Sequence, residues 1–383
     1  MDEPHTLTMR VTGSLAEIPA GQWDALAGSQ PFLRHAFLHA FERSGCVGPG
    51  TGWTPRHLTL WEGGRLAAAL PLYEKTHSLG EFVFDWSWAE AWERAGGRYY
   101  PKLLTGIPFT PVAGRRLLAA GPAARTALID QALAFARARA LSSWHVTFPG
   151  EADLLALAAA GLHRRRSVQF HWHNDGYAGF EDFLGALQRD KRKKIRQERR
   201  RVREAGVAIE RIPGREVSEA DWDFFYRCHR QTYAERGRQP YLSSAFFLML
   251  AEAMPDNLLL VLARRGGEPL AAALDVFDAE RLYGRYWGAV EHVPGLHFEV
   301  CYYQGIEFCI ERGLSVFEGG AQGEHKLARG LVPVLTHSAH WIADPGFSAA
   351  VGRFLAREAA GVAAYAEELD AHSPFRVPGN DAP

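Results

Sequence analysis

The chain has 383 residues, a length that favours two domains over a single hydrophobic core. Hydrophobic residues make up 47% and charged residues 23%, which excludes an intrinsically disordered protein. The formal net charge is −1, but this average includes one strongly basic segment at residues 189–203.

The cysteines and the N-terminal residues bear on the compartment. The four cysteines form no C-x-x-C pair, which argues against a disulfide framework or a thiolate zinc site. The first residues, MDEPHTLTMRV, carry acids where a signal peptide has lysines, and no apolar region follows. No stretch reaches the ~20 apolar residues that span a bilayer. We therefore expect a soluble, cytoplasmic protein.

The first half of the chain predicts a hairpin, a helix and closing strands. RHLTLWE (56–62) and GGRLAAALPLY (63–73) read as two strands joined by a Gly-Gly turn. A segment rich in aromatic residues follows at 78–112. A helix leading into a strand is expected over 123–149, and a further strand over 161–175, which ends on a His-Trp pair.

The second half repeats this order. NLLLVLARR (257–265) precedes GGEPLAAALDVF (266–277), a near copy of the first hairpin. A helix leading into a strand is expected over 298–320, and a closing strand that again carries His-Trp over 330–344. Three echoes in the same order indicate an internal duplication.

The predicted fold class is therefore α/β, with mixed sheets flanked by helices and used twice. We place the domains at residues 1–180 and 181–383, the second opened by a basic helix. The segment 78–112 has no counterpart in the second half.

The basic helix RDKRKKIRQERRRVR carries ten Lys or Arg residues against two acids, too many cations to pair within the helix. It has no aromatic residue for stacking on bases, so phosphates are the expected ligand, with Lys191, Arg192, Lys193 and Lys194 as the binding residues. A structural helix and a membrane-surface helix are the alternatives.

Four stretches resemble the Fem-like family of predicted N-acyltransferases, described as peptidoglycan biosynthesis/recognition proteins. They are FDWSWAEAWERAGGRYYPKLLTGIPFTPVAGRRLL, QFHWHNDGYAGFEDFLGALQRDKRKKIRQERRRV, LYGRYWGAVEHVPGLHFEVCYYQGIE and FEGGAQGEHKLARGLVPVLTHSAHW. The family resembles two tandem GNAT-type (N-acetyltransferase) folds. The resemblance implies an enzyme that forms an amide on an amine of a cell-wall precursor, amino acid or peptide. A catalytically idle module that binds peptidoglycan precursors or RNA is the alternative.

The acyl donor is left open between aminoacyl-tRNA and acyl-CoA, and no other cofactor is firmly implied. GNAT enzymes hold the coenzyme A pyrophosphate on a glycine-rich turn, whereas the matching stretch here, 287–303, has Gly295 alone near the helix start. We therefore expect acetyl-CoA to bind weakly or not at all. Fem-type transferases take aminoacyl groups from tRNA and also lack that turn.

The stretch FEGGAQGEHKLARGLVP (317–333) is the main candidate for the catalytic groups. Glu324 or His325 could relay the amine proton, and Lys326 could stabilise a phosphate or the oxyanion. Gly320 and Gly323 would let the backbone approach a substrate. A solvated turn at a strand end is the alternative, but carboxyl ends of strands are where ligands bind in open α/β sheets.

Further candidates lie in LYGRYWGAVEHVPGLHFEV. His297 and Glu299 are either catalytic groups or local helix-start groups. Arg285 is expected to meet Glu318 or a substrate anion, and Tyr283 and Trp287 are assigned to substrate binding with it. Because no G-x-S-x-G elbow is present and the cysteines of this region lie in an apolar helical pattern, we favour direct attack of the amine on the donor.

The aromatic residues of 78–112 pack in a core or line an apolar substrate pocket, and the residues assigned to such a pocket are Trp86, Trp88, Tyr100 and Phe109. Several histidines occur at H-x-H and H-x-x-H spacings, but without a carboxylate-rich signature. We therefore predict no metal site.

Overall fold

The computed structural model describes residues 7–320 and 323–376, which fall into two compact units. Unit 1 comprises Met1–Ser167 and Leu335–Ala364, and unit 2 comprises Val168–Val334 and Tyr365–Pro383. This division differs from the expected boundaries, 1–180 and 181–383, because each unit contains a segment from the other half of the sequence.

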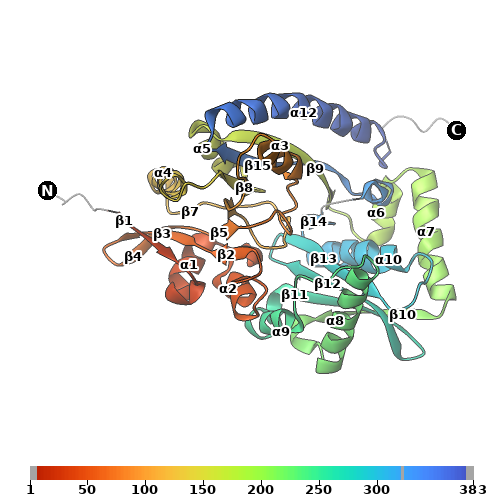
Figure 1. The fold of residues 1–383 in the computed structure, drawn as a ribbon. Coiled ribbons are helices and arrows are strands. Elements are labelled where there is room, and N and C mark those ends of the chain that lie inside the picture. The colour runs from red at the N-terminus through yellow and green to blue at the C-terminus, as the bar shows by residue number, and fades with distance from the viewer. Residues whose placement is uncertain (1–6, 321–322, 377–383) are drawn as a thin grey trace. The chain divides into compact units, whose positions relative to one another are not determined.

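Unit 1 is built on two sheets, with strand orders β1-β3-β4-β7 and β15-β8-β6-β5-β2. Its elements, most of which are labelled in Figure 1, are β1 (Thr8–Thr12), η1 (Leu15–Glu17), α1 (Ala20–Ala27), η2 (Pro31–Leu33), α2 (His35–Arg43), β2 (Trp53–Pro55), β3 (His57–Glu62), β4 (Arg65–Leu70), β5 (Leu72–Lys75), α3 (Trp86–Arg94), β6 (Lys102–Thr105), β7 (Leu118–Ala119), α4 (Pro122–Ala138), β8 (Ser143–Thr147) and α5 (Glu151–Ala159). Three elements pass from one unit into the other along the chain: β9 (His163–His173), β15 (Val332–Ile342) and α12 (Pro345–Ala371).

Unit 2 has one sheet, with strand order β10-β11-β12-β13-β14-β9. Its elements are α6 (Phe180–Ala186), α7 (Arg189–Glu204), β10 (Val207–Pro213), η3 (Gly214–Glu216), α8 (Glu219–Ala234), α9 (Ser244–Ala253), η4 (Pro255–Asn257), β11 (Leu258–Arg265), β12 (Glu268–Phe277), β13 (Arg281–Ala289), α10 (Leu296–Phe298), the π-helical η5 (Glu299–Tyr303), α11 (Gln304–Arg312), β14 (Val316–Glu318) and η6 (Glu324–Arg329).

The two predicted hairpins are present, one in each unit. β3 pairs antiparallel with β4, and β11 pairs antiparallel with β12. Both glycines of each turn have positive φ, 55° and 82° at Gly63 and Gly64, and 59° and 89° at Gly266 and Gly267. Two consecutive positive φ angles characterise the tight turn that matches strand twist, which explains the Gly-Gly pair in each copy.

The closing strands explain why the units are not continuous in sequence. The last three residues of β9 pair with β14 of unit 2, from Val316↔His173 to Glu318↔His171. Likewise β15 pairs with β8 of unit 1, from Ser338↔Thr147 to Ile342↔Ser143. Each half of the sequence thus supplies the strand that completes the sheet of the other unit.

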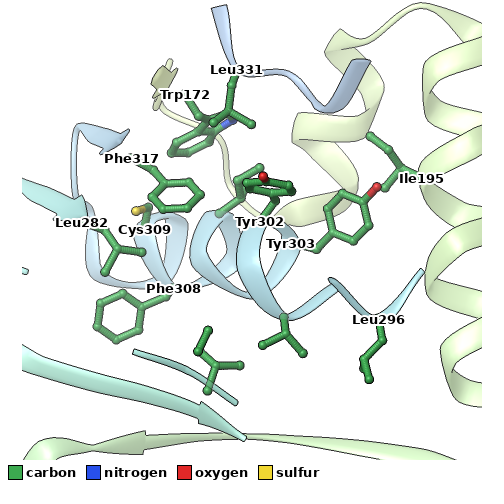
Figure 2. Packing of buried hydrophobic residues seen from close by; sticks show 14 of the residues in the cluster. Trp172, Ile195, Leu282, Leu296, Tyr302, Tyr303, Phe308, Cys309, Phe317 and Leu331 are labelled. Atoms are coloured by element: carbon green, nitrogen blue, oxygen red, sulfur yellow. The ribbon is translucent and has the colours of Figure 1, made fainter. Parts of the chain in front are cut away.

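The core of unit 2 lies around the helical run from Leu296 to Arg312. Tyr302, Tyr303, Phe308 and Cys309 of this run are buried with aromatic and aliphatic side chains from β13, β14 and α7 (Figure 2). Burial of such side chains contributes about 1.5–3 kcal/mol each and fixes the helix against the sheet. The helical run is thereby packed against β13 and β14.

No helix in the described part of the chain is long and apolar enough to cross a membrane.

Candidate active site

The candidate site lies beyond the end of β14 in unit 2, beside the middle of β13. These strands are parallel over three residue pairs, from Arg281↔Val316 to Tyr283↔Glu318. The chain leaves β13 toward α10 and leaves β14 toward η6. β13 continues from Gly284 to Ala289 beyond its last pair with β14, and a Cβ on Gly320 would lie 3.7 Å from the Gly284 carbonyl oxygen. The chain that leaves β14 therefore runs beside this unpaired part of β13, where ligands can reach the carboxyl end of β14.

Two histidines and a tyrosine make contact at this point. The rings of His297, at the start of the helical run, and His325, in η6, have centroids 6.2 Å apart. A ring nitrogen of His325 lies 3.0 Å from the Tyr302 hydroxyl, and the His297 ring lies edge-on to Tyr302 and Trp287. Burial and the nearby cations lower the pKa of His325, and they lower that of His297 to about 4. Both imidazoles are therefore neutral at pH 7 and able to accept a proton.

Lys326 brings a buried ammonium group to the same place. Its side chain is 2% exposed, and Nζ donates to the Gly320 carbonyl at 2.8 Å. Burial lowers the pKa of Lys326 to about 8, so the group is mostly charged at pH 7. An ammonium has three donors and Gly320 takes one, so within residues 7–320 and 323–376 two donors remain for a developing negative charge.

The glycines of the loop allow this close arrangement. Gly320 and Gly323 have φ angles of 87° and 116°, which are unfavourable for other residues. A Cβ on Gly323 would lie 2.4 Å from the His325 ring. The loop therefore uses glycine so that the chain can turn and the imidazole can fold back over it.

Arg329, the last residue of η6, links this segment to α7 and α10. Its side chain is buried, donates to the His325 carbonyl at 2.6 Å and to Glu198 of α7 at 2.7 Å, and lies 3.4 Å from the centre of the Phe298 ring. The same Glu198 carboxylate accepts a hydrogen bond from Tyr303. Helix α7 thus holds both connections of the site through one carboxylate.

Glu318, at the end of β14, is a further buried acid. It is 3% exposed, and its Oε1 lies 3.1 Å from Arg281 while Oε2 lies 3.9 Å from His171. Burial raises the pKa of Glu318 to about 7, even though the Arg281 and Arg285 charges act in the opposite direction. The charge of Arg285 thus acts on Glu318, one of the two partners expected for it.

The structure separates two predicted catalytic acids from this group. Both oxygens of Glu299 accept from Arg199 of α7, at 3.0 and 3.1 Å, and Oε1 also accepts from Gln304. Glu324 is exposed and accepts from the Tyr365 hydroxyl at 2.6 Å. Ion pairing and position therefore favour a structural role for Glu299 and a peripheral one for Glu324.

The predicted substrate-binding residues are divided among several environments. Trp287 contacts His297 at the site, while Tyr283 is buried and donates to Asp278. In unit 1, Trp88 and Phe109 are core residues, 4% and 6% exposed, and this burial favours packing as their role. The other two aromatic residues predicted to line a pocket are Trp86, which is exposed, and Tyr100, whose hydroxyl lies 2.8 Å from Ser78 Oγ.

Helix α7 has two different faces. Ile195, Glu198 and Val202 are buried and, with Arg199, bind the helical run that carries His297. Of the predicted phosphate ligands, Lys193 and Lys194 are exposed, Arg192 is half-buried, and Lys191 is 2.8 Å from Asp190. Lys191 and Glu324 also line a pocket of about 350 Å³. The inner face is structural, and the outer face presents cations to solvent.

Some residues of the site were not predicted from the sequence, namely Cys301, Tyr302 and Arg329. The i,i+4 spacing of His297 and Cys301 was the available signal, since such pairs are neighbours on a helix. Within residues 7–320 and 323–376, no group of three or more His, Cys, Asp or Glu side chains is placed to hold a metal ion.

Comparisons with known proteins agree with this architecture. The model of the FemAB-like family, described as peptidoglycan biosynthesis/recognition, matches residues 14–377. The structure of FemX is similar with a TM-score of 0.54 at 13% identity, covering 88% of this chain and 98% of FemX. L-PGS from Bacillus licheniformis is similar with a TM-score of 0.53 at 9% identity, covering 88% of this chain and 96% of that one. No curated protein matches the sequence. The expected fold class, α/β with mixed sheets, is confirmed, and the fold over nearly the whole chain is that of FemX and L-PGS.

Proposed function

Because the chain belongs to the FemAB-like family, we propose that it is an N-acyltransferase. It would form an amide by moving an acyl or aminoacyl group onto an amine of a cell-wall precursor, an amino acid or a peptide. The observation that carries this proposal is the buried ammonium of Lys326 beside His325, in the loop that follows β14.

The chemistry of amide formation matches these groups. Attack of an amine on an ester or thioester produces a tetrahedral oxyanion, which Lys326 would stabilise with the donors that Gly320 leaves unused. The attacking amine must lose a proton, and neutral His325 would accept it. The Tyr302 hydroxyl, 3.0 Å from the imidazole, would fix the ring for that transfer.

An aminoacyl ester is favoured over acyl-CoA as the donor. The glycine at the start of α10, Gly295, has a φ of 89°, and a Cβ there would lie 3.1 Å from the Glu198 carbonyl oxygen. This glycine is therefore explained by the close approach of α7. It is not part of a glycine-rich turn around a pyrophosphate. We propose aminoacyl-tRNA as the donor, with its phosphates on the outer face of α7.

Replacing Lys193 and Lys194 by glutamine is expected to weaken tRNA binding, because each exposed cation lost removes about one released counterion. The slope of log affinity against log salt should fall by roughly two, measured by fluorescence anisotropy with bulk tRNA. The matched control replaces Arg353 and Arg357, exposed on α12, by glutamine. An unchanged slope in the α7 variant would leave only the structural role of the helix.

The function itself is tested by incubating the protein with aminoacyl-tRNA or acyl-CoA and a set of amine acceptors, with mass-spectrometric detection of the amide. His325→Gln is expected to lower kcat by about 10²–10⁴-fold, since it removes a positioned proton acceptor. Glu324→Gln is the neighbouring control and should retain activity, because that carboxylate is engaged by Tyr365.

Binding of peptidoglycan precursor without any amide product would contradict the transferase and identify a binding module. Equal loss of activity in the Glu324 and His325 variants would contradict the assignment of His325.

A further inference from the structure

Cys301 lies in the candidate site with a histidine beside it. Its Sγ is 3.5 Å from Nδ1 of His297, one helical turn earlier. The residue is half-buried, whereas Cys46, Cys228 and Cys309 are buried. It belongs to the π-helical turn Glu299–Tyr303, and such turns are frequent at functional sites.

The position of this pair relative to Lys326 makes it more than a packing contact. The Lys326 charge acts on both Cys301 and His297. The buried carboxyl of Asp275 also acts on the thiol, and burial raises the pKa of Asp275 well above its ordinary value, which reduces the negative charge that a thiolate would meet. A nucleophile, a base and an oxyanion-stabilising cation are thus brought together.

From this geometry we infer that Cys301 receives the acyl group as a thioester before the amine does, with His297 as the base that activates the thiol. The inference rests on the proposed acyltransferase function. It replaces direct attack of the amine on the donor by two successive transfers.

His297 is a weaker base than a free imidazole and the Cys301 thiol is a weaker acid than a free thiol, so the proton must move during the attack on the donor and not before it. Burial raises the pKa of the Cys301 thiol, so no thiolate exists beforehand, while His297 is neutral and can take the proton during attack. A thiolate formed from a thiol of high pKa is a stronger nucleophile than one of low pKa. This is the arrangement of a nucleophile activated by an adjacent general base.

The two steps balance as follows. In the first, the Cys301 sulfur forms a bond to the acyl carbon while the thiol proton passes to His297. The bond from the acyl carbon to the leaving atom, which is oxygen in an ester and sulfur in a thioester, then breaks. The leaving group takes the proton from His297. In the second, the amine attacks the thioester carbon, the C–S bond breaks, and a proton from the amine restores the thiol through His297. Lys326 would face the oxyanion of both steps.

The inference is tested on the full-length protein with p-nitrophenyl acetate, an activated ester, as the acyl probe. After acid quenching, intact-mass analysis and peptide mapping are expected to find one acetyl group on Cys301 and none on the three buried cysteines. Hydroxylamine at neutral pH should remove it, because a thioester is cleaved where an acetyl amide on lysine is not.

The rates of labelling and of amide formation in three variants give a second test. Cys301→Ala should lose labelling and at least roughly 100-fold in amide formation, as expected for loss of a nucleophile. His297→Gln should slow labelling with Cys301 still present. Cys309→Ala, in the same helical run but buried in the core, should keep both.

An amide product formed at the wild-type rate by Cys301→Ala would overturn the covalent step and leave the proposed transferase in place. If Cys301 is labelled but no amine acceptor removes the acetyl group from it, the proposed transfer function would be overturned instead. Acetyl groups found only on lysines, or equally on all cysteines, would also overturn the inference.

Discussion

Lys326→Met is expected to lower kcat/KM for amide formation by about 10²–10³-fold, the effect of removing one donor from an oxyanion site. Methionine has a similar length and is apolar, so the buried position stays filled while the charge beside the reacting carbonyl is lost. The measurement is steady-state kinetics with the aminoacyl donor, with circular dichroism to verify the fold.

The pH profile distinguishes this role from mere packing. Because the pKa of Lys326 is lowered to about 8, the ammonium is present below that pH and is lost as the pH rises through it. Wild-type activity should therefore fall above about pH 8. Lys326→Arg, which stays charged, should move this limb to higher pH even if its overall rate is lower. A basic limb that is identical in wild type and Lys326→Arg would assign the titration to another group.

The fold could be predicted from the sequence where the signals were local. The two Gly-Gly hairpins follow from turn chemistry and apolar alternation, and both are present. The pairing of β9 with β14, and of β15 with β8, could not be predicted in this way. Either pairing would bury the same side chains, so no property of a single strand indicates which sheet it completes.

For the site, the local sequence predicted which loop carries ionisable groups, but it did not show which distant residues pair with the candidate groups. The glycines and ionisable residues of 317–333 predicted a loop that carries polar groups, and in the structure Lys326 donates to Gly320 within this loop while the His325 ring lies 6.2 Å from that of His297. The sequence could not show that Glu299 would be held by Arg199, a residue 100 positions away. A carboxylate at a helix start looks the same whether it is available or paired.

The most polar part of unit 1 is a buried network around Lys102. Its Nζ lies 2.8 Å from both Glu81 Oε2 and Ser78 Oγ, and it also donates to Asp85. All three of these acceptor residues are buried. Burial opposes ionisation of Asp85, yet Lys102 holds the pKa of that carboxyl well below its ordinary value. Burial raises the pKa of Glu81 to about 7. The second lysine, Lys75, is 3.7 Å from Glu81.

Lys102→Met is therefore expected to lower the free energy of unfolding by about 3–5 kcal/mol, because it leaves a buried carboxylate without its counter-charge. Urea denaturation followed by tryptophan fluorescence measures the change, with Lys194→Met, at an exposed lysine, as the control expected to stay within about 0.5 kcal/mol of wild type. Adding Asp85→Asn to Lys102→Met should recover part of the loss, since the unpaired charge is then absent. A loss below about 1 kcal/mol in Lys102→Met would contradict a network held together by charge. So would strict additivity, in which adding Asp85→Asn to Lys102→Met lowers the free energy of unfolding by as much as Asp85→Asn does in the wild type.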